Sequence, residues 1–174
     1  ILSTRVIGEM YFPGDTVNAT EAGNNFINSA LSTSFQALRG LTGGYSNGFT
    51  FTTTGTAGFA TAGATGDYLT CKSTNIYLAT YAITVETSNN ADLILDFFIN
   101  GAAENKAASR SLTSGNKIAL LSNQVFMELF IGDIIDFRIR LDPTPNNVNI
   151  QVFHANFTFS SISNSDGLRS TLTM

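Results

Sequence analysis

The chain has 174 residues, a length typical of one domain, and charged residues make up only 13% of it, with a formal net charge of −4. Nucleic-acid binding depends on clusters of Lys and Arg, so this acidic balance argues against a nucleic-acid partner. No apolar run is long enough to cross a bilayer as a helix, which argues against membrane insertion.

The first part of the chain predicts one clear strand and then weaker signals. Residues 5–12, RVIGEMYF, alternate between apolar and polar side chains, and the polar run 13–25 after them is predicted to be a surface loop. Residues 21–31 can hold a helical turn, and the Gly, Ala and Thr-rich residues 48–66 predict short strands with wide loops. The side of the first strand that is a candidate for the core or an interface consists of Val6, Gly8, Met10 and Phe12.

Two long strands are predicted in the middle of the chain, at residues 76–86 and 91–100. Ser88–Asn90 joins them and is predicted to be a hairpin turn, and Asn100–Gly101 is the strongest short turn signal in the chain. One face of the first strand consists of Tyr77, Ala79, Tyr81, Ile83 and Val85. In the second strand one face has Leu93, Leu95, Phe97 and Ile99, and the opposite face has Asp92, Asp96 and Asn100.

The last part of the chain predicts three more strands. Residues 117–142 alternate in two runs that are separated at Gly132–Asp133, and the prolines and asparagines of 142–147 predict a turn. Residues 148–162 form a final long strand whose apolar phase switches near His154, which predicts a bulge or a crossing between sheets. Eight to ten strands without a long helix predict an all-β jelly-roll sandwich of two antiparallel sheets, as one domain over residues 1–174 with its body at 5–162 and a polar tail at 163–174.

Few residues in this sequence can support catalysis or metal binding, so we expect no enzyme, no cofactor and no metal. His154 is the only histidine and lies within a strand, and Cys71 is the only cysteine and is predicted to be a buried apolar side chain. Asp133, Asp136 and Asp142 bracket a strand and are interpreted as solvated residues, with a calcium site as the alternative. Asn18 and Asn156 match the glycosylation pattern, which also arises by chance in a sequence rich in Asn and Thr.

The order of three segments, YLATYAITVE at 77–86, INGA at 99–102 and GDIIDFRI at 132–139, resembles the tumour necrosis factor and complement q-subcomponent type of jelly roll. Across roughly residues 5–162 the chain looks closest to versions in phage and other viral fibre or surface proteins. The resemblance implies ten strands in two five-stranded sheets, and a tight homotrimer. Candidates for side chains at the trimer interface are Tyr77, Tyr81, Phe126, Phe130, Phe157 and Phe159, and alternation alone does not decide which of them face the core instead.

The resemblance leads to the hypothesis of a trimeric head domain on a virion surface that attaches to a host glycan or protein and contacts other virion proteins. The alternative is a structural capsid or decoration protein without receptor binding, and a third hypothesis is a secreted ligand or lectin of the same fold. By composition, the candidate binding loops are Asn18–Asn25, Gly43–Gly48, Ala103–Arg110 and Pro143–Asn147.

Overall fold

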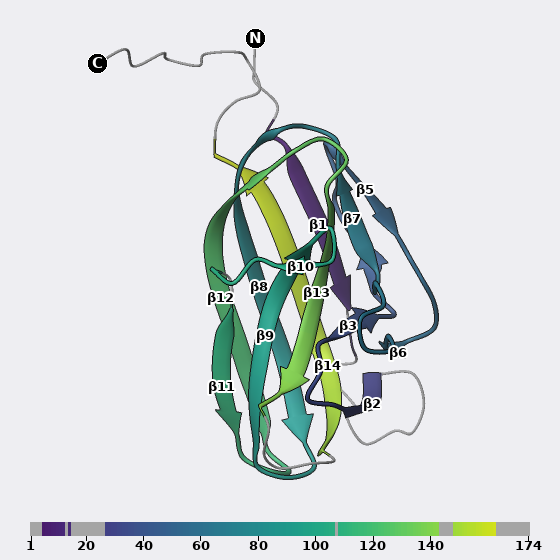
Figure 1. Cartoon of the computed structure of the whole chain (residues 1–174), viewed down its shortest axis with the longest axis vertical. Coiled ribbons are helices and arrows are strands. Elements are labelled where there is room, and N and C mark those ends of the chain that lie inside the picture. Colours follow the sequence, from purple (N-terminus) through teal and green to yellow (C-terminus); the bar gives the residue numbers. More distant parts are fainter. Residues whose placement is uncertain (1–4, 13, 15–26, 107, 143–147, 163–174) are drawn as a thin grey trace, which may run out of the picture.

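The computed structural model describes residues 5–12, 14, 27–106, 108–142 and 148–162. Within these residues the chain forms fourteen strands and no helix, and the strands build two antiparallel sheets that pack face to face (Figure 1). This confirms the predicted jelly-roll sandwich. The predicted turn at 142–147, apart from Asp142, and the polar tail at 163–174 lie outside the described residues.

The first sheet has six strands, all paired antiparallel. Its order is β12 (Ile118–Leu129), β8 (Asn75–Thr87), β14 (Val148–Ser161), β1 (Ile7–Phe12) and β4 (Thr42–Gly43), with β2 (Ile27–Leu31) paired to β14. The helical turn predicted within 21–31 is wrong where the structure describes it. Residues 27–31 form a strand because β14 offers them a hydrogen-bonding edge, with Leu31 opposite Val148.

The second sheet has eight strands. Its main order is β10 (Ala102–Ala103), β9 (Ala91–Ile99), β13 (Ile134–Leu141), β3 (Gln36–Arg39) and β6 (Gly58–Phe59). Beside them, β11 (Ser109–Thr113) pairs with β9, β7 (Tyr68–Cys71) pairs with β13, and β5 (Phe49–Thr52) pairs with β7. The fourteen described strands outnumber the ten implied by the resemblance, and three of them, β4, β6 and β10, are ladders of only two residues.

The connection at Ser88–Asn90 is not the predicted hairpin. β8 pairs with β12 and β14 in the first sheet, whereas β9 pairs with β10, β11 and β13 in the second. The turn therefore carries the chain from one sheet to the other at the end of the sandwich (Figure 1). Gly115 packs against this turn, since a Cβ at Gly115 would lie 2.7 Å from the Cα of Asn89.

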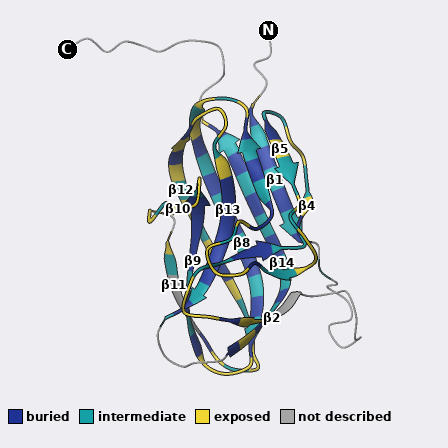
Figure 2. Ribbon diagram, turned by 45° about the vertical axis from the view of Figure 1, so that its right-hand side comes forward, coloured by how far each residue is buried: buried dark blue, intermediate teal, exposed yellow. Residues whose placement is uncertain are grey.

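The core between the sheets is aromatic at its centre. The predicted common face of five residues on β8 is confirmed, and it is the inner face, because the five side chains are at most 2% exposed. The alternation of buried and half-buried residues along these strands is visible in Figure 2. Phe97 of β9 lies with its ring centroid 5.1 Å from Phe159, 5.5 Å from Phe137 and 5.7 Å from Tyr81. Ring pairs at these separations add stability beyond the area that they bury.

The change of apolar phase in the last strand is confirmed as a bulge. The register of β14 against β8 shifts between Val152, which lies opposite Val85, and His154, which lies opposite Thr84. The extra residue lets buried side chains continue on the inner face on both sides of it, with Val152 before and Ala155 after.

Asp67 fixes the Gly-rich middle of the chain, a role that its place between two loops did not predict. Its carboxylate is fully buried and accepts hydrogen bonds from the backbone N–H groups of Gly40, Leu41 and Thr54, at 2.8, 2.8 and 2.6 Å. Charged acceptors make the stronger hydrogen bonds of proteins. Asp67 therefore holds together segments that have little apolar surface of their own.

The Asn100–Gly101 turn is confirmed, and it offers a test of backbone strain. Both residues have positive φ, 51° and 82°, as a two-residue hairpin loop between β9 and β10 requires. A Cβ at Gly101 would meet no atom within 4 Å. We expect Gly101→Ala to lower the free energy of unfolding by about 1 kcal/mol through backbone strain alone. Chemical denaturation measures this, and an unchanged midpoint would contradict it.

Candidate binding surface

The outer face of the six-stranded sheet exposes large apolar side chains. On β12 the residues at even positions point away from the core, and among them Ile118, Leu120 and Phe126 are 60%, 69% and 59% exposed. Phe126 lies opposite Leu78 of β8, and Ile76 of the same strand is also exposed. We call this surface the outer apolar face, and its members are Ile76, Leu78, Ile118, Leu120, Phe126, Phe130 and Ile162.

The same sheet contains no positive side chain. Neither Lys nor Arg occurs in β1, β2, β4, β8, β12 or β14, and the carboxylates of these strands are Glu9, Glu86 and Glu128. Glu9 is already engaged, because it accepts hydrogen bonds from the side chain of Asn156 and the backbone N–H of Tyr45. Depletion of charge around exposed aromatic and aliphatic groups distinguishes the core of protein interfaces from ordinary surface.

β12 is also an edge strand. Among the described residues it pairs only with β8, so its other edge is open along its 12 residues. Monomeric proteins usually protect a long edge with Lys, Pro or a covering loop, and β12 has neither Lys nor Pro. An open edge next to the outer apolar face is typical of a surface that associates with another chain.

The structure divides the six predicted interface residues into two groups. Tyr77, Tyr81, Phe157 and Phe159 are at most 2% exposed and belong to the core, so they are removed from the interface candidates. Phe126 and Phe130 are 59% and 53% exposed and remain candidates. The predicted set did not include Ile76, Ile118 and Leu120, which are also exposed apolar side chains on this face. For Ile118 and Leu120 the signal was present in the sequence, because β12 has apolar residues on both of its alternating faces, and for Ile76 it was the apolar start of the outer side of β8.

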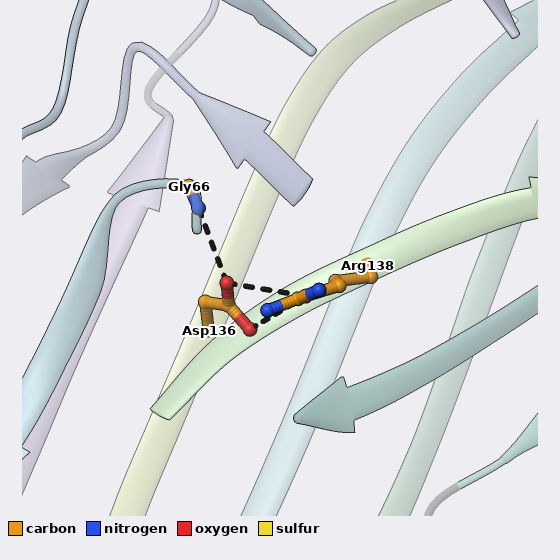
Figure 3. Close-up of polar contacts among 3 residues, drawn as sticks. All are labelled: Gly66, Asp136 and Arg138. Carbon is orange, nitrogen blue, oxygen red and sulfur yellow. Dashed lines mark hydrogen bonds and ion pairs between the residues drawn. The ribbon is translucent and has the colours of Figure 1, made fainter. Parts of the chain in front are cut away.

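The outer face of the eight-stranded sheet is different, because charged side chains are buried there. Asp136 and Arg138 of β13 form an ion pair, with Arg138 Nε 3.0 Å from Asp136 Oδ1, and the backbone N–H of Gly66 donates to Asp136 at 3.1 Å (Figure 3). The interpretation of Asp136 as solvated is wrong, since its exposed fraction is 1%. The segment around Gly66, distant in sequence, covers it. On β9, Asp96 is likewise 1% exposed.

Asp96 leads to a prediction about pH. Burial raises its pKa, which the N–H of Asn105 partly offsets, and Asp96 Oδ1 has no hydrogen-bond partner among the described residues. An acid whose pKa is higher in the folded state than in the unfolded state holds its proton more tightly in the folded state. The free energy of unfolding therefore falls as the pH rises from the unfolded pKa through the folded pKa. We expect Asp96→Asn to gain stability relative to wild type between pH 4 and pH 7. Denaturation at several pH values measures the difference, and a constant difference would contradict the assignment.

The remaining predicted site residues do not assemble into a catalytic or metal site. Among the described residues no group of three or more His, Cys, Asp or Glu side chains is placed to hold a metal ion. Asp133 instead accepts from the side chain of Asn100, and Asp142 pairs with Arg140 at 3.8 Å. Cys71 is buried as predicted, and burial raises the pKa of its thiol, which disfavours the reactive thiolate.

The glycosylation patterns and predicted loops have mixed outcomes. Asn156 lies within β14 with its amide bonded to Glu9 at 2.8 Å, a poor position for a glycan, while Asn18 lies outside the described residues. The loops 18–25 and 143–147 also lie outside them. In the loop 43–48, Tyr45 is 65% exposed.

No helix in the described part of the chain has the length and apolarity needed to span a membrane.

No protein-family model and no curated protein sequence matches the chain. Among solved structures, murine APRIL at pH 5.0 superposes with a TM-score of 0.52 at 12% identity, covering 91% of this chain and 100% of APRIL. Eiger TNF from S. frugiperda gives 0.51 at 11% identity, covering 97% and 100%. The globular domain of zebrafish complement 1qA gives 0.47 at 12% identity, covering 91% and 98%. The first two likenesses show that the chain has a jelly-roll fold of the tumour necrosis factor type.

Proposed function

We propose that this chain is a non-enzymatic binding domain that works as a homotrimer, with the outer apolar face as the contact between subunits. The observation that carries the proposal is an uncovered apolar face on a sheet that contains no Lys or Arg and ends in an open edge strand. A second copy of the chain offers the same kind of surface, and Glu86 and Glu128 are the carboxylates on its outward side. The tumour necrosis factor type of fold supports a threefold arrangement.

The trimer is proposed to sit on the surface of a virus particle and to attach it to a host glycan or protein. This finer part rests on the sequence resemblance to viral fibre and surface proteins. Three identical sites around one axis would turn a weak contact into useful avidity. The loops suited to this role that the structure describes are 43–48, with the exposed Tyr45, and 103–110 apart from residue 107.

Sedimentation of the purified chain tests the assembly. We expect one species of three times the chain mass of 18.6 kDa at micromolar concentration, and a stable monomer would overturn the proposal. The role is tested separately by counting copies in purified particles and by binding to host cells. A few copies at fibres or vertices with saturable cell binding would support attachment. Hundreds of copies without cell binding would instead support the structural role of a capsid or decoration protein.

A further inference from the structure

A pocket of about 280 Å³ opens on the outer face of the eight-stranded sheet, on the opposite side of the sandwich from the outer apolar face. The Asn100–Gly101 turn borders it, and Thr65 borders it from another part of the chain. Strand β13 contributes the remaining residues, Ile134, Asp136 and Arg138. The pocket therefore brings together three segments that are distant in the sequence, and all of its lining residues are described.

Arg138 is held rigidly in this pocket. Its side chain is only 4% exposed, and its Nε donates to both oxygens of Asp136, at 3.0 and 3.2 Å. The guanidinium carbon lies 4.2 Å from the ring centroid of Phe98, so the planar group stacks on an aromatic face. An arginine fixed at Nε and on one face loses little further freedom when it binds a ligand through its terminal nitrogens.

The pocket has hydrogen-bond donors to offer and few acceptors. Neither terminal nitrogen of Arg138 has an acceptor among the described residues, although arginine carries five N–H donors. The oxygens of Asp136 are already occupied by Arg138 Nε and the N–H of Gly66. The carbonyl oxygen of the Asn100 side chain is occupied as well, since it accepts from the N–H of Ile134 at 3.0 Å.

We propose that this pocket binds the carboxylate group of a small ligand, with the terminal nitrogens of Arg138 as the donors. A carboxylate presents two acceptor oxygens that match the fork of a guanidinium, and this pairing is stronger than one to a neutral carbonyl. Asp136 fixes the guanidinium but also offsets part of its charge, so the expected dissociation constant lies in the millimolar range. The pocket lies at the small end of ligand sites, which suits a small acid or one acidic group of a larger molecule.

The probe for this site is propionate, and propionamide is its neutral isostere. In an NMR titration of the labelled full chain at constant ionic strength, we expect propionate to shift the signals of Arg138 Nε, Asn100 and Gly101 saturably. Propionamide should bind at least tenfold more weakly. Equal binding of the two probes, or shifts by propionate that do not saturate at these residues, would overturn the proposal.

Variants separate the arginine from the pocket itself. Arg138→Lys keeps a charge beside Asp136 but loses the fork, so we expect at least tenfold weaker propionate binding. Ile134→Trp fills the pocket without removing a partner of Arg138, so we expect it to weaken propionate binding as well. This variant tests the pocket if Arg138→Lys fails to fold. Arg140→Lys is the matched control. Arg140 lies on the same strand as Arg138 and also stacks on an aromatic ring, that of Phe35, but it does not line the pocket. Wild-type affinity in Ile134→Trp would contradict the proposal.

Discussion

Phe126→Glu is expected to convert the proposed homotrimer into monomers. Phe126 is 59% exposed on the outer apolar face, where it lies opposite Leu78. Burying a carboxylate among apolar groups without a partner is costly, and the six strands of this sheet hold no Lys or Arg to pair with it. At roughly 2 kcal/mol for each of three interfaces, dissociation would become easier by about four powers of ten. Sedimentation velocity at micromolar concentration measures the change.

Thr50→Glu is the matched control for this substitution. Thr50 is exposed on β5 of the other sheet, so the variant adds the same charge to a strand outside the outer apolar face. We expect it to remain trimeric. A trimer in the Phe126 variant, or monomers in both variants, would place the subunit contact elsewhere. Circular dichroism of both proteins distinguishes loss of assembly from loss of folding.

Local alternation predicted the inner faces of the long strands well, because burial on one side of a sheet imposes a period of two residues. The inner face of β8 and the buried side of β1 are as predicted. The bulge near His154 was also predictable, since an inserted residue reverses the phase of every side chain after it.

Pairing between strands was not predictable from local pattern. The turn at Ser88–Asn90 shows that the chain reverses, but not whether the next strand joins the same sheet. The strand at Ile27–Leu31 depends on an edge of β14 that is more than 100 residues away in the sequence, so its own residues gave only a weak signal. Alternation left open which aromatic side chains face the core for the same reason. Buried and exposed aromatic side chains both lie on strands whose side chains alternate between two faces. Which face of the strand is covered depends on where the second sheet packs.

Burial of charge was the other feature that the sequence pattern could not show. Asp136 and Arg138 occupy the positions of a solvated face in the alternation of β13. They are buried because the segment at Gly66 folds over them from a distant part of the chain. The candidate pocket therefore follows from the tertiary structure, whereas the part of the outer apolar face that β12 contributes, Ile118, Leu120 and Phe126, could have been found by reading both faces of that strand.

Phe97→Ala is expected to lower the free energy of unfolding by about 4 kcal/mol. Phe97 is fully buried, and its ring packs against Tyr81, Phe137, Phe157 and Phe159 with centroids 5.1–6.3 Å away. Truncation removes a large apolar group and leaves a cavity that four rings from three other strands cannot close without losing their own contacts. Because β9 and β13 meet β8 and β14 at this point, the loss weakens the contact between the two sheets as a whole.

Tyr45→Ala controls for the removal of an aromatic ring, because Tyr45 is 65% exposed and its hydrogen bond to Glu9 is made by its backbone N–H, which the substitution keeps. We expect it to change stability by less than about 0.5 kcal/mol. Urea denaturation of both variants at one fixed protein concentration keeps the contribution of assembly constant. Removing a phenyl ring from a close-packed interior leaves a cavity that costs more than about 1 kcal/mol. A smaller loss for Phe97→Ala would therefore mean that the two sheets do not meet around this ring.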